Sequence, residues 1–86
     1  MMQDTYDRDG KLVIPALHVA YVADTLAQFA PDKYADYDTA AEEACRLLRA
    51  WRDLRYTAYC FERGFVGAAA LLGSVRRHLD VKRKGR

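Results

Sequence analysis

Thr39–Phe65 reads TAAEEACRLLRAWRDLRYTAYCFERGF, the longest helical pattern in this 86-residue chain. Thr39 and Glu42 match a capping box, so we expect a helix to begin at Thr39. It is expected to continue without interruption to a break bracketed by Gly64 and Gly67. At 100° per residue, the apolar residues fall within a sector of about 100°, the core side of an amphipathic helix: Ala40, Ala44, Leu47, Trp51, Leu54, Ala58, Phe61 and Phe65.

A second helical pattern precedes this stretch. Asp9-Gly10 is a turn signal, and the residues after it read as a short extended segment. Pro15 suits the first turn of a helix, where its missing N–H costs nothing. Pro31 ends the helix, because the residue before a proline is pushed out of the helical region. The expected core stripe consists of Val19, Val22, Leu26 and Phe29.

A third helix is predicted from about residue 66 to residue 80. Its first half, Gly67–Gly73, has small residues on most sides and is expected deep in the bundle or at a dimer seam. Residues 81–86 are predicted to form a frayed basic tail. The expected core positions are Ala68, Leu72, Val75 and Leu79.

Short connections imply antiparallel neighbours, and the fold class is therefore all-α, a small bundle of three main helices. We expect one helical domain over residues 1–86, with an extended N-terminal segment at 1–14. A chain this short buries only roughly 60–65% of its unfolded surface. Association of two copies is a common way to gain burial, which makes a homodimer one of the expected states.

The composition excludes several classes of protein. With 51% hydrophobic residues the chain is not disordered. Its longest uncharged run, residues 64–75, is shorter than the roughly 20 residues that span a membrane. The acidic start has no apolar stretch behind it, so no secretory signal is predicted. Cys45 and Cys60, about 22 Å apart on one predicted helix, are expected to be free thiols, which favours a cytoplasmic location.

The charge is divided between the two halves of the sequence. Residues 1–43 hold nine acids and three bases, a net of −6, whereas residues 44–86 hold eleven bases and three acids, a net of +8. Such asymmetry points to a charged partner or to self-association. The acidic half could be a solvated surface, or it could imitate nucleic acid towards a basic groove. The two halves could also attract each other within a monomer or across a dimer.

One face of the long predicted helix carries the candidate partner surface. Arginine and tyrosine are enriched at protein interface hot spots, and the same residues can hold phosphates and stack bases. They can also be a solvated helix face with packed rings. The candidate residues are Arg49, Arg52, Tyr56, Tyr59 and Arg63.

A second basic cluster lies near the C-terminus. Mobile cations of this kind could give salt-dependent, sequence-independent affinity for nucleic acid, or they could only increase solubility. The third helix lacks the strongly amphipathic pattern of a membrane-surface segment. The candidate nucleic-acid-binding residues are Arg76, Arg77, Lys82, Arg83 and Lys84.

Catalytic and metal-binding patterns are absent from the sequence. His18 and His78 lie on different predicted helices, and two distant cysteines do not supply clustered metal ligands. There is no phosphate-binding glycine loop and no nucleophile elbow. We therefore predict a protein that is not an enzyme and binds no metal or cofactor.

Residues 9–16, DGKLVIPA, resemble the strand-to-helix element of the looped-hinge bacterial transition-state regulators and antitoxins. The resemblance implies an interlaced, β-rich dimer that binds DNA. It covers eight of the 86 residues, and that family returns to strands where this chain is expected to be helical from Thr39 onward. We therefore assign no family on these residues.

The favoured interpretation is a small non-catalytic protein that docks on a larger protein or complex and modulates or inhibits it, as adaptors and inhibitors encoded by phages and mobile elements do. The alternative is a nucleic-acid-binding regulator that uses the basic half. The third helix begins with small residues where base-reading side chains would stand, which argues against a helix-turn-helix.

Overall fold

The computed structural model describes residues 4–84 of the chain, and the side chains of residues 4–79. This part is mostly helical, as predicted, but it contains four helices rather than three. The elements are β1 (Thr5–Tyr6), β2 (Leu12–Val13), α1 (Ala16–Phe29), α2 (Tyr37–Ala50), α3 (Arg52–Glu62) and α4 (Ala68–Lys84). The two strands pair antiparallel, with Thr5 opposite Val13.

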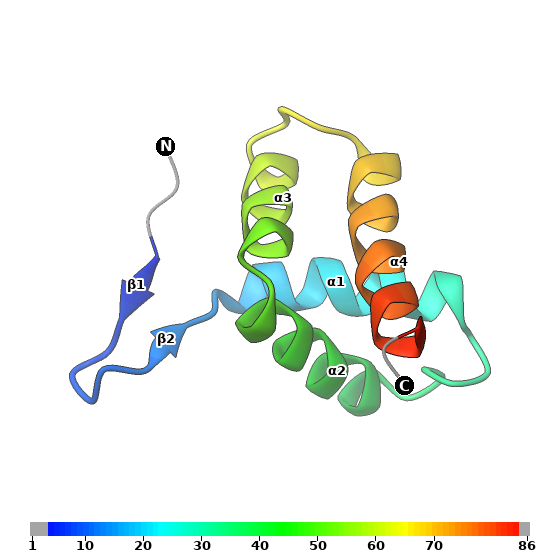
Figure 1. Ribbon diagram of the computed structural model, residues 1–86, viewed down its shortest axis with the longest axis horizontal. Helices are drawn as coiled ribbons and strands as arrows, with labels where there is room; N and C mark the ends of the chain where they lie inside the picture. Colours follow the sequence, from blue (N-terminus) through cyan, green and yellow to red (C-terminus); the bar gives the residue numbers. More distant parts are fainter. Residues whose placement is uncertain (1–3, 85–86) are drawn as a thin grey trace.

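The helices pack around α1. Figure 1 shows α3 and α4 running antiparallel, joined by a loop, while α1 crosses behind them. The β1–β2 hairpin lies on the side of α3 away from α4. α1 contacts each of the other three helices. No helix in the part described is both long and apolar enough to cross a membrane.

Every helix contributes to one hydrophobic core. Most positions predicted for the core of α1, α2 and α3 are buried, Val22, Leu47 and Leu54 among them. Phe29 and Phe65 are exceptions, because both rings are exposed. The large side chains that are fully buried are Leu26, Leu47, Leu48, Leu54, Leu71, Val22 and Val75.

The prediction of one continuous helix over residues 39–65 is wrong, because the chain bends at Trp51. Trp51 has φ −123° and ψ 108°, outside the helical region, and it separates α2 from α3. Arg55 stabilises this bend: its Nη1 donates to the carbonyl oxygens of Leu48 at 2.8 Å and Arg49 at 3.2 Å. The last carbonyls of α2 therefore find a side-chain donor in place of the next helical turn.

The beginning of α2 also differs from the prediction. Asp36, not Thr39, is the N-cap residue, and its carboxylate accepts hydrogen bonds from the N–H and the hydroxyl of Thr39. The prediction of a capping box formed by Thr39 and Glu42 is therefore wrong. An aspartate at this position also interacts favourably with the positive end of the helix dipole.

Of the four core positions predicted in α4, only Val75 is fully buried. Leu71 and His78 are buried with it, whereas Ala68 is exposed and Leu72 and Leu79 are half-buried. The small residues of the first half, from Gly67 to Ala70 with Gly73, are exposed, so this half does not lie deep in the bundle. The helix continues to Lys84, into the segment predicted as a frayed tail.

Candidate functional site

Arginines attach the N-terminal hairpin to α2 and α3. The Arg55 guanidinium binds the Asp4 carboxylate through two contacts, Nε to Oδ1 at 3.2 Å and Nη2 to Oδ2 at 3.0 Å. Hydrogen bonds from Arg55 hold the pKa of Asp4 below its ordinary value of 3.8. Arg52 contributes a longer contact to Asp4 at 3.7 Å. Arg49 donates to the Leu12 carbonyl oxygen at 2.8 Å, which fixes the second strand.

A histidine–glutamate pair joins α1 to α3. His18 lies in the first turn of α1 and is only 8% exposed. Its Nε2 is 2.7 Å from Oε1 of Glu62, the last residue of α3. The pair connects the two helices beside the point where the hairpin enters α1.

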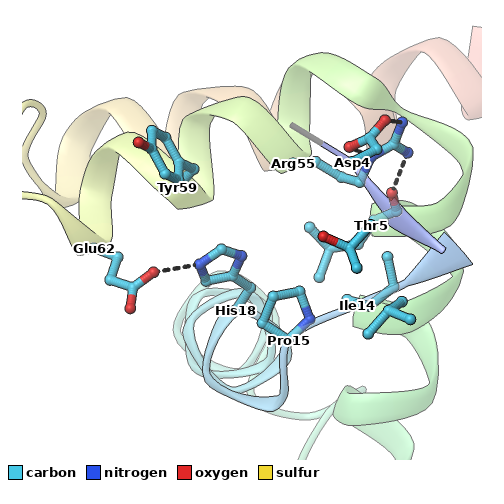
Figure 2. Close-up of a pocket in the computed structure, with 10 residues that line it drawn as sticks. Asp4, Thr5, Ile14, Pro15, His18, Arg55, Tyr59 and Glu62 are labelled. Carbon is cyan, nitrogen blue, oxygen red and sulfur yellow. Dashed lines mark hydrogen bonds and ion pairs between the residues drawn. The ribbon is translucent and has the colours of Figure 1, made fainter. Parts of the chain in front are cut away.

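A cavity of about 320 Å³ lies between the Asp4–Arg55 pair and the His18–Glu62 pair. In Figure 2, His18 of α1 and Pro15, just before that helix, lie on one side of it, while Tyr59 and Glu62 belong to α3. Its charged groups bind one another, and its remaining wall is largely aliphatic, so it suits an apolar side chain better than a free ion. The lining residues are Asp4, Thr5, Val13, Ile14, Pro15, His18, Leu48, Arg55, Tyr59 and Glu62.

The outer face of α3 extends from this cavity into solvent. The rings of Tyr56 and Tyr59 stack with centroids 6.4 Å apart, and the Arg63 guanidinium lies 5.4 Å from the centre of the Tyr59 ring. The Arg52 side chain is 66% exposed and Tyr56 is 49% exposed. These four residues are named the α3 surface below. Tyr59 belongs to both the α3 surface and the cavity wall.

The Cys60 thiol, one helical turn from Tyr56, affects the hydroxyl group of that tyrosine. A hydrogen bond with this thiol raises the pKa of Tyr56 above its ordinary value of 10.0. The hydroxyl is uncharged at neutral pH, as a tyrosine hydroxyl ordinarily is, and can donate as well as accept a hydrogen bond. Cys45 and Cys60 are both free and lie on different helices.

The structure brings four of the five predicted partner-binding residues together. Arg52, Tyr56, Tyr59 and Arg63 form the α3 surface, whereas Arg49 lies on α2 and holds the hairpin. The bend at Trp51 causes this separation. Sequence reasoning missed Asp4, His18, Arg55 and Glu62, because their pairings join residues 44 or more positions apart and leave no local pattern.

The residues predicted for nucleic-acid binding are less clearly grouped. Arg77 binds Asp53 at 3.0 Å, and the Arg76 guanidinium lies 5.7 Å from the centre of the Phe29 ring. The antiparallel arrangement of α3 and α4 differs from the crossed helices of a helix-turn-helix (Figure 1). Lys82, Arg83 and Lys84 belong to α4, and their side chains lie outside the described part.

A histidine and an aspartate pair between α3 and α4. His78 Nε2 is 2.9 Å from both oxygens of Asp53, and the imidazole stacks on Trp51 with centroids 4.2 Å apart. Ser74 Oγ and His78 Nδ1 are buried without a hydrogen-bond partner.

No group of three or more potential metal ligands gathers among the residues described. No family model, curated protein or solved structure matches the chain. The geometry of its own residues is therefore the basis for a functional proposal.

Proposed function

We propose that this chain is a small non-catalytic module that binds a larger protein or complex through the α3 surface and modulates or inhibits it. The observation that carries the proposal is the continuity of the α3 surface with the cavity, through Tyr59. Interface hot spots combine tyrosine and arginine with a pocket that an anchor side chain fills. The α3 surface supplies the tyrosines and arginines, and Tyr59 connects them to the cavity that the hairpin, α1 and α2 complete.

The side chains of the α3 surface already contact one another, which lowers the entropic cost of binding a partner. Tyr56 and Tyr59 stack on each other, and Arg63 lies against Tyr59. Side chains that already contact one another lose less rotamer freedom when a partner arrives. The α3 surface is therefore better prepared for an interface than four freely moving side chains.

The residues of the cavity and the α3 surface indicate which chemical groups the proposed partner carries. An apolar side chain of the partner enters the cavity against Val13, Ile14 and Leu48. Carboxylates on either side of this anchor meet Arg52 and Arg63, which face solvent. The carboxylates nearest the cavity, Asp4 and Glu62, are already bound to Arg55 and His18 and repel such a partner less than free ones.

A comparative pull-down from native lysate tests the proposal. The bait is the intact protein, compared with Arg52→Ala combined with Tyr56→Ala, and the readout is quantitative recovery of discrete proteins with and without nuclease. Tyr37→Ala combined with Glu42→Ala changes exposed residues on α2 and is the matched control. We expect the α3 variant to lose at least tenfold in recovery and the control to behave as the wild type, with equal circular dichroism for all three.

Equal recovery by the α3 variant and the wild type would contradict the proposal. Recovery that disappears with nuclease would instead support the alternative function, a nucleic-acid-binding regulator that uses the basic half. In that case binding weakens linearly with salt on logarithmic axes. A hot-spot protein interface responds far less to salt.

A further inference from the structure

The connection between α3 and α4 holds a phenylalanine in solvent. α3 ends in a Schellman motif, in which the Gly64 N–H donates to the Phe61 carbonyl at 3.1 Å and the Phe65 N–H donates to the Cys60 carbonyl at 2.9 Å. Gly64 has φ 80°, as this motif requires. The apolar residue after the glycine commonly packs on its own helix in this motif. Phe65 instead remains 70% exposed, although its backbone is fixed.

A groove of about 330 Å³ opens beside this connection, between α1, the end of α3 and the start of α4. Tyr21 and Phe61 meet edge to face in its wall, with ring centroids 4.9 Å apart. Aromatic edges of this kind favour a third ring in contact. Its apolar lining consists of Tyr21, Phe61, Ala68, Ala69, Leu71 and Leu72.

The exposed ring and the groove meet the requirements of a two-fold interface. In such an interface one patch must hold both halves of the contact. Phe65 is three residues from Ala68 in the groove wall, so both halves lie at one corner of the molecule. The exposed alanines at the start of α4 have no side chain beyond Cβ to keep a second backbone away.

The charges at this corner are also complementary. Asp24 lines the groove and is exposed, while Arg63, also exposed, lies two positions before Phe65. Across a two-fold axis, the arginine that accompanies each ring comes close to the aspartate of the opposite groove. A second copy therefore supplies both the ring and the charge that the groove accommodates.

We propose that the chain self-associates through this corner as a two-fold dimer, in which Phe65 of each protomer occupies the groove of its partner. This interface shares Arg63 with the α3 surface but is separate from the cavity, and it does not depend on the proposed function. It also explains why a chain with a small core leaves a large aromatic ring at a rigid turn in water.

Sedimentation over a range of protein concentrations tests the dimer. We expect the wild type to dimerise and Phe65→Ser to raise the dissociation constant about tenfold to hundredfold, the effect of exposing one buried aromatic ring. Ala69→Glu, which places a charge in the groove wall, is expected to do the same. Tyr6→Ser removes another exposed ring, from the hairpin, and is the matched control.

Exchanging the charges of Asp24 and Arg63 tests whether these two residues face each other across the dimer interface. Asp24→Arg alone weakens dimerisation, and adding Arg63→Asp restores part of it. A wild type that stays monomeric at every concentration would overturn the proposal, and so would a dimer that Phe65→Ser and Ala69→Glu leave unchanged. Loss of dimerisation in Arg52→Ala with Tyr56→Ala would place the contact on the α3 surface and would also contradict it.

Discussion

Arg55 connects three segments with one side chain. It belongs to α3, binds Asp4 at the start of the hairpin and donates to the last carbonyls of α2. Its side chain is only 14% exposed, so these hydrogen bonds are largely shielded from water. The planar guanidinium can serve the carboxylate and the carbonyls together, which a single ammonium group cannot do.

Arg55→Lys should therefore destabilise the protein although it conserves the charge. We expect a loss of about 1–3 kcal/mol in the free energy of unfolding, because carbonyls at the α2–α3 bend lose their donor. Urea unfolding measures this loss in the free energy of unfolding. Arg52→Lys, at a more exposed position with a 3.7 Å contact, is the matched control and should change stability by less than about 0.5 kcal/mol. Equal losses in the two variants would show that the bend does not depend on the guanidinium.

At the scale of the elements, the loop between α3 and α4 depends on one glycine conformation. Gly64→Ala should destabilise the protein by about 1–2 kcal/mol, the cost of the left-handed region for a residue with a Cβ. The added Cβ meets no atom within 4 Å, so the loss is conformational rather than steric. Thermal unfolding measures the change.

Gly73→Ala is the matched control for this prediction. Gly73 lies within α4, a Cβ added there would also meet no atom within 4 Å, and its φ is not positive. It should be neutral or stabilising by up to about 1 kcal/mol, because alanine is the better helix former. A similar loss at both positions would contradict the conformational explanation.

The helical class could be predicted from the sequence because hydrophobic periodicity is a local signal. The bend at Trp51 could not, since Leu47, Trp51, Leu54 and Ala58 continue one apolar stripe across it. The interruption depends on Arg55, whose partner Asp4 lies 51 positions away. The core face of α4 was ambiguous for another reason, because adjacent apolar residues fit two helical faces, and packing selected Leu71 with Val75.

Only the part of the candidate site that lies on one helix face could be predicted from the sequence. Tyr56 and Tyr59 of α3, with Arg63 directly after it, share a face that periodicity identifies. A continuous helix would place Arg49 on the same face, but the bend at Trp51 separates it. The cavity could not be found, because it forms where the hairpin, α1, α2 and α3 meet.

At the scale of the whole molecule, two carboxylates tie distant parts of the fold together. Asp4 binds Arg55 and Arg52, and Asp53 binds His78 and Arg77 across α3 and α4. Burial alone would raise the pKa of Asp53, but hydrogen bonds from His78 and Arg77 outweigh it and lower the pKa below 3.8. The pKa of Asp4 is lowered as well.

These shifts determine the acid response. A carboxyl whose folded pKa is depressed stabilises the fold at pH values above its unfolded pKa, and this contribution is lost as the pH falls through the folded pKa. Asp4→Asn with Asp53→Asn should therefore be less stable than wild type at neutral pH, and the difference should shrink below pH 3.8.

Urea unfolding over a pH series measures how the stability difference between the double variant and the wild type shrinks as the pH falls. Asp32→Asn, which changes an exposed carboxylate between α1 and α2, is the control and should follow the wild-type curve. A constant difference between the double variant and wild type at every pH would show that the two carboxylates act through packing rather than through their charge.

The stacking of Trp51 on His78 gives the molecule an intrinsic optical signal. Trp51 is the only tryptophan in the chain, and its indole lies flat against an imidazole carried by α4. Contact with imidazole quenches indole emission, so fluorescence intensity follows the spacing between the α2–α3 bend and α4. Any ligand, partner or second copy that shifts α4 would become visible without a label, in a cuvette, from this single residue.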